Sequence, residues 1–117
     1  HTFGHAIEAI TDYQIPHGHA ISIGMDLANY ISLTKGMITD IQFEEMHTIL
    51  KKNIPPFRLT EQNIDNYFRA LSKDKKNKGK LLGCILTFGP GKVEKVFLNL
   101  DESLKSVVLS YSEKYAV

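Results

Sequence analysis

The sequence predicts one mainly α-helical domain over residues 1–117 that carries a single small β-hairpin. Apolar residues recur at helical spacing along most of the chain, as in helices that bury one face. The pattern changes near residue 81, where two β-prone runs flank the stretch FGPGK, and this arrangement is typical of a hairpin. Hydrophobic residues make up 43% and charged residues 23% of the chain, which argues for a globular core and against disorder.

The first two helices are expected over residues 2–11 and 17–36. Pro16 disfavours helical geometry at the residue before it and suits a helix that starts just after it. Gly36 is well placed to end the second helix. The predicted core face of the first helix holds Phe3, Ala6, Ile7 and Ile10. The apolar surface of the second includes Ile21, Met25, Ala28 and Leu33.

The next two helices are expected over residues 39–52 and 60–74, joined by the rigid connector NIPPF. Thr39, with Gln42 three residues further on, resembles a capping box. Thr60 is the expected N-cap of the later helix. The core side of that helix holds Ile64, Tyr67, Phe68 and Leu71.

The last third of the chain holds a basic loop, KDKKNKGK, then the hairpin, then a helix over residues 102–117 for which Asp101 is the expected cap. Cys84 lies in an apolar β-prone run and is expected to be a small core residue, not a nucleophile. His47 stands beside charged residues and is expected at the surface. Asp26 is expected to be a buried or partly buried polar residue without chemistry of its own.

The composition argues against some binding partners and indicates a cellular environment. The net charge of +1 argues against nucleic acid or membrane as partners. The single cysteine excludes a disulfide within the chain and fits a reducing compartment. Without a signal peptide or a long apolar run, a soluble cytoplasmic protein is expected. The abrupt start on His1, without methionine, leads us to expect a piece of a longer protein.

Four of the five histidines fall within the first nineteen residues. His1 and His5 are four apart, so a helix places them on one face. A helix–loop–helix can bring His17 back beside them, and neutral imidazole is a common ligand for zinc. The pattern therefore raises the hypothesis of a metal site, although HxxxH alone is a weak signal. The alternative is that these histidines cap helices or form hydrogen bonds in the core.

Two details favour the metal site over that alternative. Gly18, directly after His17, would allow close approach of the backbone, and the repeated GHA stretches put small residues on both helices. Glu8 lies on about the same face as His1 and His5. It is either an acidic ligand or a carboxylate that orients a histidine, and the second role is the more common.

Three blocks, HTFGHAIEA, HGHAISIGM and KDKKNKGKLLGCILTFGPGKV, resemble the C-terminal half of the 3-dehydroquinate synthase family, which belongs to the sugar-phosphate cyclases. The resemblance runs in order from His1 to about Leu100. It implies a helical domain that follows an NAD-binding, Rossmann-like domain absent from this chain. It further implies a divalent metal, zinc or another such as cobalt, held by His1, His17 and a glutamate of the other domain.

The same resemblance implies roles for three more residues. His5 matches a histidine near the substrate phosphate that assists proton transfer. Lys75 and Lys76 match the lysines of a DKK motif, at least one of which contacts the substrate, and Lys75 is the weakly favoured one. The neighbouring lysines of the loop, Lys73, Lys78 and Lys80, are left as surface charge.

The implied activity is that of a lyase of the shikimate pathway, which makes aromatic amino acids. A phosphorylated heptulosonate is oxidised by NAD, loses phosphate, is reduced again and closes to 3-dehydroquinate. The implied partner is a small sugar phosphate, and the resemblance also implies a homodimer of the full-length protein. This piece alone is expected to be inactive. Alternatives are a metal-dependent polyol or glycerol-type dehydrogenase of the same fold, or a cyclase with another sugar phosphate.

One departure from the family pattern bears on substrate identity. The family usually has HGE where this chain has HGH, so His19 replaces a glutamate. His19 could add positive charge at low pH or mark a different sugar-phosphate substrate. The alternative is that it orients a neighbouring group or lies at the surface.

Overall fold

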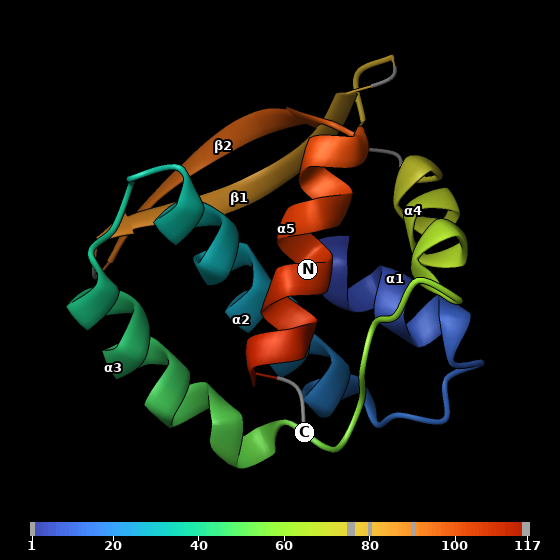
Figure 1. The fold of residues 1–117 in the computed structure, drawn as a ribbon, viewed down its shortest axis with the longest axis horizontal. Helices are drawn as coiled ribbons and strands as arrows, with labels where there is room; N and C mark the ends of the chain where they lie inside the picture. The colour runs from blue at the N-terminus through green and yellow to red at the C-terminus, as the bar shows by residue number, and fades with distance from the viewer. Residues whose placement is uncertain (1, 75–76, 80, 90, 116–117) are drawn as a thin grey trace.

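The computed structural model describes residues 2–74, 77–79, 81–89 and 91–115. It is mostly helical with one two-stranded hairpin, as predicted (Figure 1). The elements in chain order are α1 (Thr2–Ile10), α2 (His17–Thr34), α3 (Asp40–Leu50), the 3-10 turn η1 (Lys51–Asn53), α4 (Ile64–Ser72), β1 (Leu81–Gly89), β2 (Lys92–Asn99) and α5 (Glu102–Tyr115).

Helix α2 lies at the centre of the molecule, where it contacts α1, α3, α5 and β1 (Figure 1). The apolar surface predicted for it is only partly correct, because Met25 is 48% exposed. Its buried hydrophobic residues are Ala20, Ile23, Leu27, Tyr30 and Ile31. The helix is apolar on several sides, so the positions of its neighbours decide which residues are covered.

Most predicted helix ends are confirmed. Helix α2 starts directly after Pro16, and Gly36 has a φ of +72°, the left-handed conformation that ends helices. The Thr39 capping box is formed with Gln42. Asp101 Oδ1 accepts a hydrogen bond from the Leu104 backbone N–H at 2.9 Å, so Asp101 caps α5.

The prediction that Thr60 caps the fourth helix is wrong. Helix α4 begins only at Ile64. Before it, the Asn63 side-chain oxygen accepts a hydrogen bond from the Thr60 backbone N–H at 2.7 Å. The side chain thereby closes a turn over residues 60–63, and this turn replaces the first helical turn that the sequence pattern predicts.

The hairpin pairs Leu82 with Leu98 and Cys84 with Val96 in antiparallel register. Strand β1 packs on α2, and its side chains alternate between a buried and an exposed face, with Ile85 52% exposed. Cys84 is buried, and burial raises the pKa of its thiol to about 11. The thiol stays protonated near neutral pH, which confirms the prediction of a core residue.

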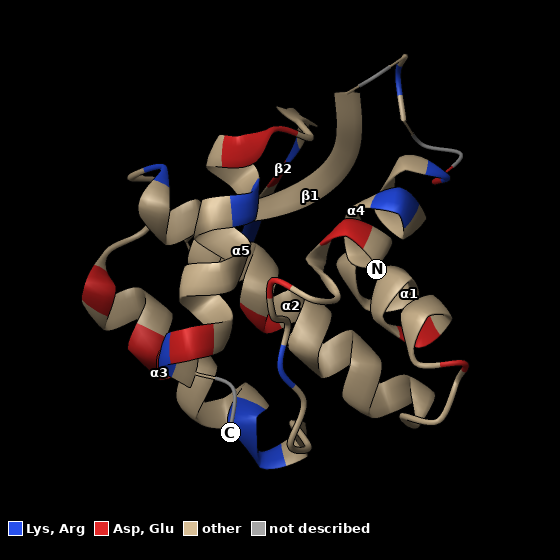
Figure 2. Ribbon diagram, turned by 45° about the vertical axis from the view of Figure 1, so that its right-hand side comes forward, with Lys and Arg blue, Asp and Glu red and all other residues tan. Residues whose placement is uncertain are grey.

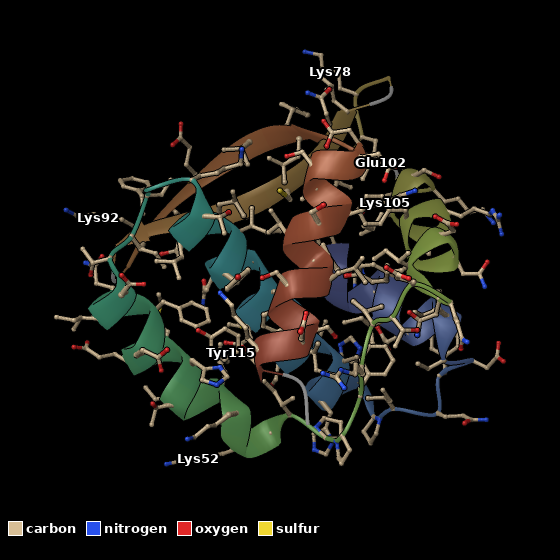
Figure 3. The ribbon with its side chains drawn as sticks, viewed as in Figure 1. Lys52, Lys78, Lys92, Glu102, Lys105 and Tyr115 are labelled. Carbon is tan, nitrogen blue, oxygen red and sulfur yellow. The ribbon has the colours of Figure 1, made fainter. Side chains whose placement is uncertain are left out.

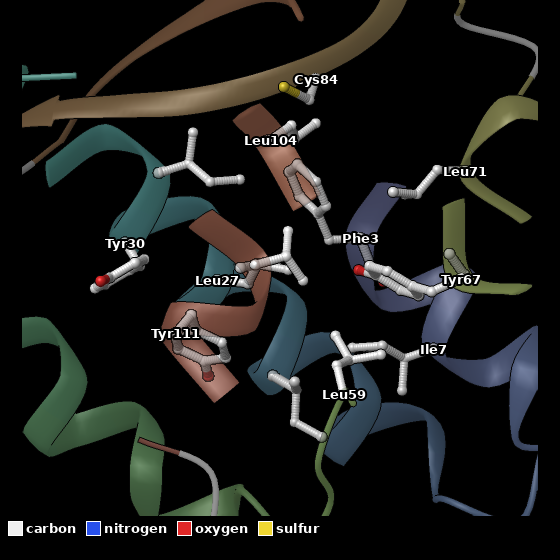
Figure 4. Packing of buried hydrophobic residues seen from close by; sticks show 14 of the residues in the cluster. Phe3, Ile7, Leu27, Tyr30, Leu59, Tyr67, Leu71, Cys84, Leu104 and Tyr111 are labelled. Carbon is white, nitrogen blue, oxygen red and sulfur yellow. The ribbon is translucent and has the colours of Figure 1, made fainter. Parts of the chain in front are cut away.

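The hydrophobic core lies between the helices and β1. Figure 4 shows Phe3 of α1 among Leu27, Tyr67 and Leu104, which come from three other helices. The buried Tyr67 hydroxyl donates a hydrogen bond to the Phe3 carbonyl at 2.9 Å. This contact joins α4 to α1, the helix that carries His5.

The prediction that His47 lies at the surface is wrong. Its side chain is 12% exposed, and its Nδ1 lies 2.8 Å from Asp26 Oδ2. Asp26 is fully buried, as predicted, and the same oxygen accepts a hydrogen bond from the Tyr111 hydroxyl at 2.7 Å. The rings of Phe43 and Tyr115 cover His47, with centroids 5.6 and 4.8 Å away. The Asp26 network, defined as Asp26, His47 and Tyr111, therefore joins α2, α3 and α5.

The surface carries both signs of charge around the molecule (Figure 2), in line with the small net charge. Across the part of the chain that the structure describes, no helix has the length and apolarity needed to cross a membrane.

Candidate functional site

Helices α1 and α2 touch backbone to backbone at two glycines. A Cβ atom placed on Gly24 would lie 2.8 Å from the Cα of Gly4, and one placed on Gly4 would lie 2.9 Å from the Ala20 carbonyl oxygen. Real Cβ atoms do not approach backbone this closely, so both positions require glycine. The expectation that small residues let these helices pack closely is confirmed.

The expected role of Gly18 in this close approach is wrong. A Cβ atom at Gly18 would meet nothing within 4 Å. The first turn of α2 points Gly18 into open space, and the crossing lies further along at Gly24. The spacing of glycines in the sequence could not distinguish the two, since only the crossing point of the helices decides it.

The close crossing brings His5 of α1 beside His17 of α2. Their ring centroids lie 6.1 Å apart, with the ring planes at 24°. Both residues are exposed, and 66% of the His17 side chain is accessible. Two imidazoles from different helices therefore stand side by side at the surface, as the helix–loop–helix hypothesis expects.

Glu8 is a buried carboxylate that contacts one of these rings. It is 8% exposed, and its Oε2 lies 3.0 Å from His17 Nδ1. When the carboxylate accepts a hydrogen bond from Nδ1–H, Nε2 is the unprotonated nitrogen that can bind a ligand. This is the contact expected of a carboxylate that orients a histidine, so the first of the two Glu8 alternatives, direct ligation, is the less favoured.

This arrangement fits a divalent metal on the side of His17. Metal-bound histidines commonly donate their other ring N–H to a carboxylate, which sets the tautomer and the ring orientation. The His17 side chain is 66% accessible, so an ion can approach the ring from solvent. Among the described residues, no group of three His, Cys, Asp or Glu side chains is placed to hold a metal ion.

Several predicted site residues have no described position. His1, Lys75 and Lys76 lie outside the described residues, as does Lys80. His19, the departure from the family pattern, is half-buried in the first turn of α2. The roles predicted for His1, Lys75 and Lys76 stay predictions from their motifs.

Lys73 is exposed, as expected of surface charge. However, it lines the same cavity as His5, between α1 and the end of α4. Its position directly before the DKK motif could not show that it lines this cavity, because the motif does not give the direction of the chain after α4.

The chain is similar to 3-dehydroquinate synthases along nearly its whole length. Residues 1–77 match the family described as 3-dehydroquinate synthase C-terminal. The 3-dehydroquinate synthase of Helicobacter pylori (strain HPAG1) is 39% identical over 116 residues, which cover 98% of this chain and 33% of that protein. That of Campylobacter jejuni subsp. jejuni serotype O:23/36 (strain 81-176) is 33% identical over 97% of this chain and 32% of its own length.

Among solved structures, one similar chain is described as 2-deoxy-scyllo-inosose synthase complexed with carbaglucose-6-phosphate, NAD+ and Co2+. It superposes with a TM-score of 0.75 at 27% identity, covering 94% of this chain and 32% of that chain. A second structure of 2-deoxy-scyllo-inosose synthase gives a TM-score of 0.70 at 26% identity, over 94% of this chain and 30% of that one. The chain thus spans about a third of the length of the relatives that it matches.

Proposed function

Because the chain belongs to the 3-dehydroquinate synthase family, through its C-terminal domain, we propose that it is the helical domain of an NAD- and metal-dependent sugar-phosphate cyclase. The proposed reaction converts a phosphorylated heptulosonate to 3-dehydroquinate with loss of phosphate. The observation that carries this proposal is the 39% identity to a 3-dehydroquinate synthase over 98% of the chain. In this proposal the NAD-binding domain lies in the remainder of the enzyme, since the chain spans about a third of the length of its relatives.

In this proposal His1 and His17 hold the metal, zinc or cobalt, together with a glutamate of the other domain. When bound, the metal polarises the substrate oxygens that it chelates, and NAD carries out the redox chemistry. The support from this chain is the Glu8–His17 contact at 3.0 Å. A structurally similar synthase bound to NAD+ and Co2+ supports the same cofactor classes.

The proposal assigns three further roles to residues of this chain: orientation of His17, proton transfer and neutralisation of substrate charge. Glu8 holds His17 in the tautomer whose Nε2 is free. His5, exposed beside His17, exchanges a proton with the substrate as a general acid and base. Lys75 and Lys76 neutralise negative charge on the substrate as compact cations.

Replacing Glu8 with alanine is expected to weaken metal binding by about 10- to 100-fold, the usual cost of losing a carboxylate that orients a metal-bound histidine. Glu8→Gln should lose less, because its amide oxygen still accepts a hydrogen bond from Nδ1–H of His17. The measurement is a calorimetric titration of the full-length enzyme with Zn²⁺ or Co²⁺. The exposed Glu45, on α3, provides the matched control: Glu45→Ala should bind metal as the wild type does. Equal metal affinity of Glu8→Ala and wild type would contradict the orienting role.

The proposed function is tested by steady-state turnover of the phosphorylated heptulosonate by the full-length enzyme. Wild type is expected to release phosphate and form 3-dehydroquinate, and Lys75→Ala with Lys76→Ala is expected to abolish this turnover. Unchanged turnover in the double variant would count against the cyclase assignment.

A related cyclase with a different sugar phosphate is the second candidate. Two observations favour it: the similarity to 2-deoxy-scyllo-inosose synthase, and His19 in place of the usual glutamate. Offering the enzyme a hexose 6-phosphate beside the heptulosonate distinguishes the candidates. Phosphate release from the hexose 6-phosphate alone would replace the first assignment with the second.

A further inference from the structure

A groove of about 410 Å³ lies between α2 and the hairpin, beside the start of α1. Helix α2 and strand β1 contact each other (Figure 1), yet the contact leaves this space open at the surface. The residues that line the groove are mainly apolar and include Thr2, Phe3, Met25, Ile85 and Val93. The groove is therefore an apolar surface shared by α1, α2 and both strands.

The large apolar side chains of the groove are exposed. Met25, Ile85 and Val93 come from α2, β1 and β2, and each of them is exposed although they line one cavity. Hydrophobic residues that are exposed singly are common on soluble proteins, whereas a contiguous exposed apolar patch marks a contact surface. Nothing in the part of the chain that the structure describes covers this patch.

The charged side chains of the hairpin lie outside the groove. Figure 3 shows Lys92 at the start of β2 and Lys78 before the start of β1, and both point away from the molecule. No charged residue lines the groove, and neither His5 nor His17 does. The centre of a contact between proteins is depleted of charge in the same way. The groove therefore has the composition of a packing surface and is separate from the candidate site.

The free edge of β1 lies next to the same groove. Among the described residues, β1 pairs with β2 alone, so its other edge has no partner strand. The side chains of Thr2 and Asn77 form hydrogen bonds with the carbonyl and the N–H of Gly83, at 3.4 and 3.2 Å. They protect this edge only near the start of β1. Proteins commonly cover a strand edge with a neighbouring segment, and a cover over the groove would protect the rest of it.

The relatives of the chain supply a segment that can reach the groove. The matching family model describes the C-terminal part of the synthases, and the chain spans 33% of the Helicobacter pylori relative. Most of the length of such a relative therefore precedes the part that corresponds to this chain. Because Thr2 and Phe3 line the groove, a segment attached to the start of α1 is held beside it at a high effective concentration.

We propose that the segment that directly precedes His1 in the full-length protein packs apolar side chains into this groove, against α2 and the hairpin. Residues upstream of His1 then complete the helical unit. This segment is favoured over a second copy of the chain because a tethered segment loses less translational and rotational freedom when it packs. The inference rests on the family membership of the chain and is independent of the reaction proposed for it.

Labelling of an introduced cysteine in the full-length protein tests whether the groove is covered. Val93 and Ile41 are 64% and 71% exposed in this chain, so Val93→Cys and Ile41→Cys form a matched pair. Val93→Cys is expected to react with N-ethylmaleimide at least about tenfold more slowly, because a covered position reacts only during local opening. Peptide mass spectrometry measures each position, and each rate is divided by that of the same variant unfolded in urea. Similar relative rates for the two variants would overturn the proposal.

Photo-cross-linking of the full-length protein identifies what covers the groove. Photo-methionine, incorporated in place of methionine, places a reactive group at Met25, which lines the groove. Met37 and Met46 pack against the core and serve as controls. Cross-links from Met25 to peptides that precede His1, in a band of monomer mass, are the expected result.

Two results of the cross-linking would overturn the proposal. Cross-links from Met25 in a band of dimer mass would make a second copy the occupant of the groove. Cross-links from Met25 to residues 1–117 of the same chain alone would leave the upstream segment without a place there. Neither labelling nor cross-linking depends on turnover, so a failure of the proposed reaction does not affect either measurement.

Discussion

Replacing Gly24 with alanine is expected to lower the free energy of unfolding by about 3 kcal/mol, the range for forced overpacking of a close contact. The added Cβ atom would meet the backbone of Gly4 at 2.8 Å, and backbone has no rotamer with which to move away. Helices α1 and α2 would have to separate, which would also part His5 from His17. Urea unfolding of the protein measures the loss of stability.

Gly18→Ala, in the same helix, is the control for this prediction. Its Cβ atom would meet nothing within 4 Å, and alanine is a better helix former than glycine by up to about 1 kcal/mol. This variant should be as stable as wild type or more stable. Similar losses in both variants would show that the crossing at Gly24 is not the cause.

Replacing Asp26 with alanine is expected to cost about 3 kcal/mol of stability, as does removal of one partner from a buried polar pair. The carboxylate accepts hydrogen bonds from His47 and Tyr111, and both would lose their shared acceptor. Asp26→Asn should cost less, because its side-chain oxygen still accepts one hydrogen bond. Urea unfolding compares the two variants, and equal stability of Asp26→Ala and wild type would contradict the role of the network.

The Asp26 network also makes stability depend on pH. Burial raises the pKa of Asp26 above its ordinary value of 3.8, against the opposing effects of Tyr111 and His47. The folded state thus holds the Asp26 proton more tightly than the unfolded state, so this contribution is complete below pH 3.8 and is lost as pH rises through the folded pKa. The stability of wild type relative to Asp26→Asn should therefore fall over that range.

Asp65 is the matched control for the pH experiment, because its shift has the opposite sign. A hydrogen bond from Lys105 lowers the pKa of this exposed carboxyl, so its contribution is present above the ordinary value of 3.8 and lost as pH falls. The stability of wild type relative to Asp65→Asn should rise with pH. If the relative stability changed with pH in the same direction in both comparisons, Asp26 would be excluded as the source of the pH dependence.

Local features of the fold could be predicted because their causes lie a few residues apart. A capping box joins Thr39 to Gln42, and Asp101 caps a helix through the N–H of Leu104. The core face of α4 follows from helical spacing, and all four residues predicted for it are buried. The prediction of a cap at Thr60 was wrong because the Asn63 side chain accepts a hydrogen bond from the Thr60 backbone N–H. That bond closes a turn over residues 60–63 in place of the first helical turn.

The candidate site also has features that could be predicted from the sequence and features that could not. The histidine spacing and the family blocks were sufficient to predict that His5 and His17 come together and that Glu8 orients a histidine. The sequence could not show whether Gly24 or Gly18 lies at the helix crossing. It also could not show that His47 contacts Asp26, or that Lys73 lines the same cavity as His5. These contacts join residues on different elements.

By itself, then, the amino-acid sequence determined the helices, most of their caps, the hairpin and the family, since each depends on short-range spacing or on a motif read in order. Only the tertiary structure decided which glycine lies at the helix crossing and which histidine lies beside Asp26. The physical reason is that close packing between helices depends on their crossing points and angles, and these are set by all the contacts of the core together.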